Sequence, residues 1–131
     1  MIVDWIEDSD ILREDHFETC LALNELLNYG DYFIEPMCRG INCGTDGSKC
    51  HFNHNNSDLN SFSTVEIIHF DLPEKLTMEE FYYYLAIAYN NFVKYSLQPN
   101  VIKLFAEGLE YFRKACNIKG TVHKEAVQQP Q

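Results

Sequence analysis

Three cysteines and one histidine in the middle of the chain have the spacing of a metal-binding cluster. Cys38, Cys43, Cys50 and His54 read C-x4-C-x6-C-x3-H within the run MCRGINCGTDGSKCHFNH. Three thiolates and one imidazole form a complete tetrahedral ligand set for Zn²⁺ and leave no coordination position for water or substrate. The spacing therefore predicts a zinc ion with a structural role and not a hydrolytic one.

Two other interpretations of the cluster stay open. A disulfide framework fits less well, because the cysteine count of five is odd and the chain begins MIVDWIEDSD, which is acidic and lacks the apolar stretch of a secretory signal. Reduced thiols gathered by chance are the second alternative, but the glycines, Asn42 and Asp46 between the cysteines favour tight turns. His51 is a rival fourth ligand, although the three-residue interval between Cys50 and His54 suits His54 better.

The cluster ends in a recognisable motif. Residues 47–54 read Gly-Ser-Lys-Cys-His-Phe-Asn-His, a glycine-containing turn followed by C-x-F-x-H, and residues 36–55 thereby resemble the CCCH-type zinc-finger family. The resemblance implies weak binding of single-stranded RNA, alone or within a complex, with aromatic rings stacking on bases. It also implies that Phe52 is the stacking ring and that Arg39 and Lys49 are basic RNA contacts.

The charge of the chain points to a different partner. The chain has 20 acidic residues against 10 Lys and Arg, a net charge of −10, and residues 1–35 hold ten of the acids with only Arg13 to oppose them. Nucleic-acid-binding domains usually carry a basic patch, because phosphate contacts supply much of their affinity. The alternative function is therefore a zinc-stabilised adaptor, in which the acidic first helix together with Tyr82 and Tyr83 binds a basic protein partner.

Composition restricts the remaining possibilities. With 131 residues, 46% of them hydrophobic, the chain is sized for one globular unit. No apolar run approaches the roughly 18 residues that a membrane-spanning helix needs. We expect no enzyme, since the nucleophile-elbow, phosphate-loop and HExxH patterns do not occur, and we expect no DNA partner. Free cysteines beside a zinc site predict the nucleus or cytoplasm.

Hydrophobic periodicity predicts three helices, over about 11–29, 77–97 and 99–117. Ser9 or Asp10 can cap the first, and Thr77 with Glu80 forms a capping box for the second. The last two helices are expected to form an antiparallel hairpin, and a short β segment or an extended strap is expected near 62–70. The predicted fold is mainly α, with the CCCH finger inserted between the first helix and the hairpin. The expected regions are an acidic helical segment at 1–35, the finger at 36–56, a connecting strap with the hairpin at 57–118, and a disordered tail at 119–131.

Several single positions also carry predictions. Cys20 lies on an apolar stripe and is expected to be a buried thiol, while His16 is expected at the solvated surface. Gly108 can permit close approach of a neighbouring helix. Tyr82 and Tyr83 fall off the apolar stripe of their helix, so they form either an exposed partner surface or part of a wide buried face.

Overall fold

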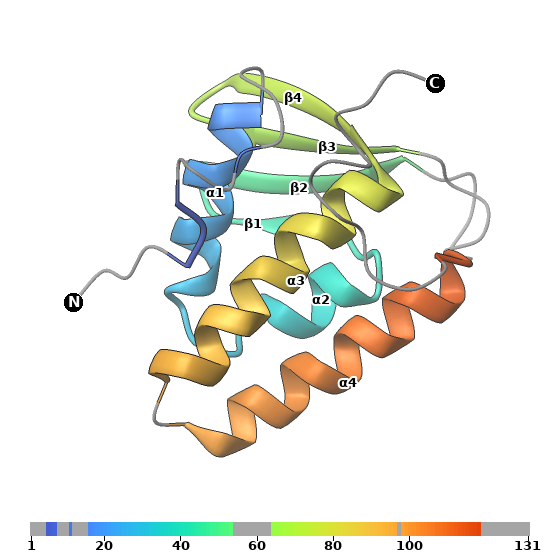
Figure 1. The fold of residues 1–131 in the computed structure, drawn as a ribbon. Helices are drawn as coiled ribbons and strands as arrows, with labels where there is room; N and C mark the ends of the chain where they lie inside the picture. The colour runs from blue at the N-terminus through green and yellow to red at the C-terminus, as the bar shows by residue number, and fades with distance from the viewer. Residues whose placement is uncertain (1–4, 8–10, 12–15, 54–63, 97, 119–131) are drawn as a thin grey trace.

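The computed structural model describes residues 5–7, 11, 16–53, 64–96 and 98–118, which form a helical layer against one antiparallel sheet (Figure 1). The elements in chain order are α1 (Phe17–Leu27), α2 (Ile34–Cys38), β1 (Cys43–Gly44), β2 (Ser48–Asn53), β3 (Thr64–His69), β4 (Leu72–Thr77), α3 (Met78–Tyr95) and α4 (Pro99–Ala115). In the described ranges the fold is therefore α/β. The predicted mainly α domain with one short β segment is wrong.

The four strands follow chain order in the sheet, β1-β2-β3-β4, and every neighbouring pair is antiparallel. β1 and β2 form a hairpin in which Cys43 lies opposite Cys50. β2 continues directly into the centre of the sheet, where Ser48 pairs with His69 and Asn53 pairs with Thr64. Within the described residues, the segment that resembles a zinc finger consequently contains the end of α2 and the strands β1 and β2, so it is part of the sheet and not a module inserted between helices.

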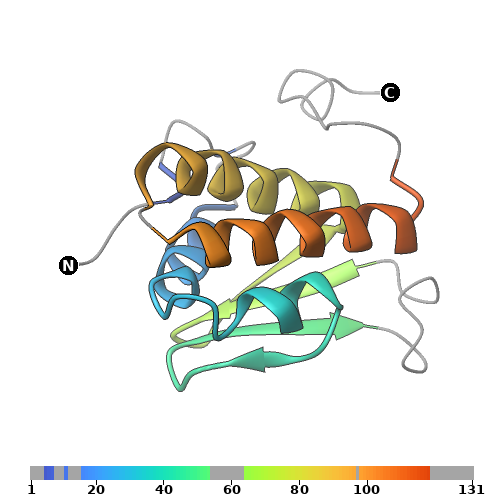
Figure 2. The same ribbon diagram turned by 90° about the horizontal axis from the view of Figure 1, so that it is seen from below.

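The helices described by the structure pack on one face of this sheet. α1 contacts β2, β3 and β4, and α3 contacts β3 and β4, while α4 packs against both α3 and α2. Figure 2 shows α3 and α4 side by side over the sheet, which confirms the predicted antiparallel hairpin of helices. No helix in the described ranges is long and apolar enough to cross a membrane.

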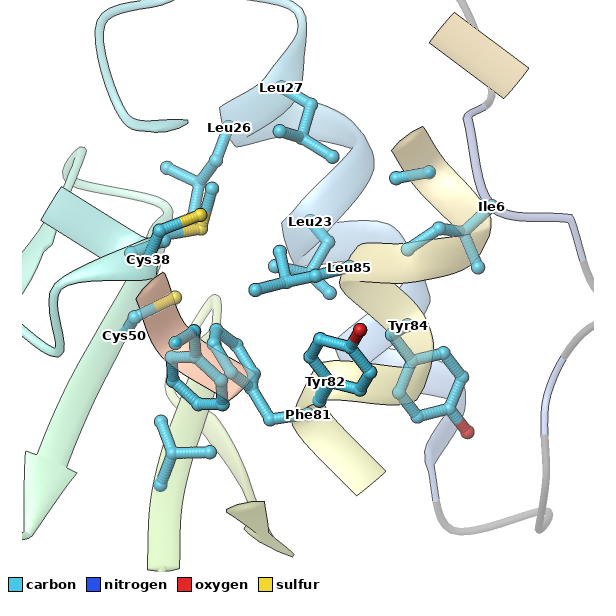
Figure 3. Close-up of a cluster of buried hydrophobic side chains, with 14 of the residues drawn as sticks. Ile6, Leu23, Leu26, Leu27, Cys38, Cys50, Phe81, Tyr82, Tyr84 and Leu85 are labelled. Atoms are coloured by element: carbon cyan, nitrogen blue, oxygen red, sulfur yellow. The ribbon is translucent and has the colours of Figure 1, made fainter. Parts of the chain in front are cut away.

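Local signals account for where the long helices begin. The Thr77 hydroxyl accepts a hydrogen bond from the Glu80 N–H, and the Glu80 carboxylate accepts one from the Thr77 N–H, so the predicted capping box is confirmed. α4 begins with Pro99 in its first turn, where a missing N–H costs nothing. The core between helices and sheet is rich in aromatic rings, with Phe81 near its centre (Figure 3).

α1 begins at Phe17 without a capping side chain from the residue before it. Its first free N–H groups, those of Glu18 and Thr19, donate instead to the carboxylate of Glu74 on β4, over 3.0 and 2.7 Å. A tertiary contact thus replaces the local cap. The expected caps, Ser9 and Asp10, lie outside the described residues.

Candidate functional site

The hairpin of β1 and β2 brings two of the predicted zinc ligands together. Cys43 and Cys50 occupy opposite positions of the two strands, and a hydrogen bond joins their side chains. The bond from Cys50 lowers the pKa of Cys43, against the opposing effect of burial. The same bond, together with complete burial, raises the pKa of Cys50 well above its usual range. The pair therefore consists of a buried donor thiol and a half-buried acceptor that ionises more readily.

Cys38 lies in the interior at the end of α2. Burial raises the pKa of its thiol to about 12, and the negative charges of Cys43 and Glu35 act in the same direction. Its sulfur lies against α4 at Gly108, where an added Cβ would be only 2.8 Å away. The predicted close approach at Gly108 is confirmed, and the neighbour that it admits is α2.

The fourth predicted ligand, His54, lies outside the described residues. Within those residues no three His, Cys, Asp or Glu side chains form a group that could hold a metal ion. The donor chemistry of the three thiols still suits Zn²⁺, which binds them as thiolates and releases their protons. His51 does not join them. It is exposed and adjacent to Cys50 along β2, so its side chain points to the opposite face of the sheet.

The residues predicted to contact RNA do not share one surface. Phe52 is only 4% exposed, and its ring packs edge-on against Phe81 with 5.4 Å between centroids, so it is not available to stack on a base. Arg39, at the end of α2, lies 5.0 Å above the ring centroid of Tyr111. Lys49 is on the face of the sheet turned away from the helices, because its neighbours in β2 point inward.

The tyrosines predicted to contact a partner are also buried. Tyr82 is 8% and Tyr83 is 6% exposed, and Tyr82 stacks parallel to Phe112 with 6.3 Å between centroids. The wide buried face, which was the second interpretation of these residues, is the one observed. The exposure on which a partner role for Tyr82 and Tyr83 depended is absent.

The acidic side chains of α1 bind other parts of the fold. The Glu18 carboxylate lies 3.3 Å from Nδ1 of His69. The Glu25 carboxylate accepts hydrogen bonds from the hydroxyls of Thr45 and Ser48 in the β1–β2 turn. These contacts occupy the two carboxylates of α1, whereas Asp4, Asp8, Asp10, Glu14 and Asp15 of the predicted acidic surface lie outside the described residues.

An exposed aromatic turn between α1 and α2 was not predicted. Tyr29 is 54% and Tyr32 is 73% exposed, and both rings pack edge-on against Phe33, at 5.4 and 4.8 Å between centroids. Asp31 between them is exposed as well, and Gly30 takes up a positive φ of 71° that a turn can require. We call residues 29–32 the tyrosine turn. The run NYGDYF held the signal, since its aromatic residues flank turn-forming ones.

The sheet face turned away from the helices, here called the outer sheet face, carries several basic groups. The register places His51 beside Glu66 and Glu66 beside Lys75, with Lys49 beside Ile68 one row away. His51 and Lys75 are exposed, and Lys49 is partly exposed. In a chain of net charge −10, this face is locally neutral to positive.

A buried histidine lies where the sequence predicted a solvated one. His16 is 1% exposed; its Nδ1 lies 3.0 Å from the Tyr84 hydroxyl and its Nε2 lies 3.7 Å from the Glu80 carboxylate. Both partners belong to α3, so this polar cluster fixes the start of α1 against the helical hairpin. The partners are 64 or more positions away in sequence, and nothing local in the sequence indicates them.

Comparison with known proteins does not assign a family to this chain. No family model, curated protein or solved structure matches it. The likeness to CCCH fingers thus covers residues 36–55 and depends on the motif alone.

Proposed function

We propose that this chain is a non-catalytic adaptor that binds a basic protein partner through the tyrosine turn, with a thiol-bound zinc ion fixing the helix behind that turn. The observation that carries the proposal is the exposure of Tyr29 and Tyr32 together with Asp31. Tyrosine is enriched at protein interfaces because it combines a large apolar ring with a polar tip. Exposed aromatic rings can contact a partner directly, which the buried Tyr82 and Tyr83 cannot.

The geometry of the tyrosine turn suits a lysine or arginine of a partner. Both rings are held at the surface by Phe33, so little side-chain freedom remains to be lost on binding. A cation over a tyrosine ring gains about 0.5–2 kcal/mol, depending on how well the site excludes water. The exposed Asp31 adds opposite charge within the turn itself. The net charge of −10 would also accelerate encounter with a basic partner.

Zinc enters the proposal as a structural group. Cys38, Cys43, Cys50 and His54 would hold it, and it would supply a covalent-strength link between the end of α2 and the β1–β2 hairpin. α2 begins directly after Phe33, the residue that supports both exposed tyrosines. Fixing the far end of this five-residue helix would therefore limit motion of the tyrosine turn.

RNA binding is the second candidate, and one observation favours it. The outer sheet face places Lys49, His51 and Lys75 together, and an open antiparallel sheet is a surface on which single-stranded RNA can lie. Glu66 in the middle of this face opposes phosphate, and the described strands present no Phe, Tyr or Trp side chain there. We therefore favour the adaptor function over RNA binding.

Two fluorescence-anisotropy titrations of the full chain distinguish the candidates. One uses a labelled peptide of alternating lysine, arginine and serine, and the other uses labelled oligouridylate, both at about 0.15 M salt. The adaptor predicts peptide binding that Tyr29→Ala/Tyr32→Ala weakens about tenfold or more, as expected for interface tyrosines. The control Tyr95→Ala, which removes another tyrosine with 68% exposure, should leave it unchanged. Binding of oligouridylate that Lys49→Ala/Lys75→Ala abolishes would instead support RNA.

A further inference from the structure

Residues 5–7 lie against α1 and α3 as a docked segment, ahead of α1 in the chain and far from α3 in sequence. Ile6 is fully buried and Trp5 is 7% exposed. Figure 3 shows Ile6 beside the ribbon of α3, and its side chain belongs to the same buried core as Leu23 and Leu85. Side chains of α1 and α3 thus surround the docked segment, and we call the space that this segment fills the groove.

Asparagine side chains hold the backbone of the docked segment. The Asn24 amide accepts from the Ile6 N–H over 2.8 Å and donates to the Ile6 carbonyl over 2.7 Å. The N–H and the carbonyl of Ile6 are thus both hydrogen-bonded to one partner, as those of a residue in a β-strand pair are. Cys20 donates its S–H to the same carbonyl, and Asn91 of α3 donates to the Trp5 carbonyl. Because all of these bonds go to the main chain, any peptide could make them.

The side chains of the docked segment supply the selectivity. The Trp5 ring stacks on Phe92 with 4.1 Å between centroids and 17° between planes. Ile6 fills a fully enclosed position in the core next to it. The groove therefore favours an aromatic residue followed by an aliphatic one.

One polar group of the docked segment makes no hydrogen bond in the groove. The indole N–H of Trp5 is buried and has no hydrogen-bond partner in the structure as described. Buried donors are nearly always paired, because burying a donor without a partner removes its hydrogen bonds to water and replaces them with nothing, which costs free energy. A phenylalanine at this position would keep the stacking on Phe92 and would bury no unpaired donor. Trp5 is thus an imperfect occupant of the position.

We propose that the groove between α1 and α3 is a peptide-binding site, and that residues 5–7 occupy it as an internal ligand. Its external ligand is a segment of another protein in which an aromatic residue, preferably phenylalanine, precedes an aliphatic one. The site shares no residue with the tyrosine turn, so its existence does not depend on the adaptor proposed above. Binding would release residues 5–7 from the groove.

The wild-type full chain contains its own reporter, because Trp5 is the only tryptophan. We would titrate it with the synthetic peptide MIVDFIEDSDI and record the tryptophan emission. The proposal predicts a saturable red shift as the indole moves into water, at peptide concentrations up to about millimolar, since the tethered segment competes at a high effective concentration. The peptide MIVDSSEDSDI, with serines in place of the aromatic and aliphatic residues, should cause no shift.

A variant with an emptied groove supplies the second readout. Trp5→Ala/Ile6→Ser removes both anchors, so it should bind fluorescein-labelled MIVDFIEDSDI at least about tenfold more tightly than the wild type does. Adding Asn91→Ala should weaken this binding by about fivefold, the loss expected for one hydrogen bond. The neighbouring exposed Asn90→Ala is the matched control and should have no effect.

The two readouts decide the proposal in either direction. No emission shift with the phenylalanine peptide at millimolar concentration, or an equal shift with the serine peptide, overturns it. A folded Trp5→Ala/Ile6→Ser variant that binds the labelled peptide no better than the wild type also overturns it. If circular dichroism shows that this variant is unfolded, the titration of the wild-type chain decides alone. Substituting Tyr29 and Tyr32 should alter neither result, which separates this site from the proposed function.

Discussion

Phe52 shows how one residue type in one motif can serve two different purposes. In a finger that displays its aromatic ring, the ring stacks on a base; here the ring is packed against Phe81 inside the core. The sequence pattern is the same in both cases, because C-x-F places two apolar side chains at the period of two that a half-buried strand also has. Only the pairing of β2 with β3 distinguishes them.

Replacing Phe52 should therefore affect folding. Phe52→Ala removes a buried ring and leaves a cavity, so we expect a loss of about 3–5 kcal/mol in the free energy of unfolding. Urea denaturation of the full chain measures the effect. The adjacent and exposed His51→Ala is the control and should change stability by no more than about 0.5 kcal/mol. Equal, small effects of both substitutions would show that the ring is not in the core.

At the scale of elements, the contact between Glu74 and α1 links the sheet to the first helix. The carboxylate accepts hydrogen bonds from two backbone N–H groups of the helix and from the Thr19 hydroxyl. A negative charge at this position also interacts favourably with the helix dipole. The sheet thus supplies the cap that the chain before Phe17 does not provide.

Removing this carboxylate should destabilise the protein. Glu74→Ala leaves the helix N–H groups without acceptors, and we expect a loss of about 1–2 kcal/mol, the usual cost of a missing N-cap. The neighbouring exposed Lys75→Ala serves as the control in the same urea measurement. A Glu74→Ala protein as stable as the control would mean that water caps α1 equally well.

Elements with strong local signals were predicted from the sequence: the two long helices, and β3 within the segment expected near 62–70. The strands β1, β2 and β4 were not predicted. A capping box indicates the start of the helix Met78–Tyr95, and a proline in the first turn indicates the start of the helix Pro99–Ala115. β4 reads LPEKLT and has only one buried residue. Its proline is typical of an edge strand, so the sequence alone does not indicate a strand here. α2 has five residues, too few for a helical period to be visible.

The candidate sites show the same division between local and distant information. The sequence placed Cys43 and Cys50 in one cluster, because the ligands of a hairpin lie close along the chain. It could not show that the turn at Tyr29 and Tyr32 is exposed while Tyr82 and Tyr83 are covered. That difference depends on α4, whose Phe112 lies over Tyr82.

At the scale of the whole molecule, zinc would connect the sheet to the tyrosine turn. Cys43→Ser should release the metal and lower the melting temperature, because metal binding contributes to the free energy of folding. Elemental analysis and thermal denaturation of the purified full chain give both readouts. Cys116→Ser is the control, since this half-buried cysteine of the α4 C-cap lies outside the cluster. Identical metal content and melting in both variants would remove zinc from the account.

The most direct test of the central claim is photo-crosslinking of the full chain in cells, with identification of the protein and RNA recovered. The account predicts a basic protein whose recovery falls about tenfold with Tyr29→Ala/Tyr32→Ala, as for loss of interface anchors, and is unchanged with Tyr95→Ala. Recovery of RNA that depends on Lys49 and Lys75, together with a set of proteins that the tyrosine substitutions leave unaltered, would contradict it.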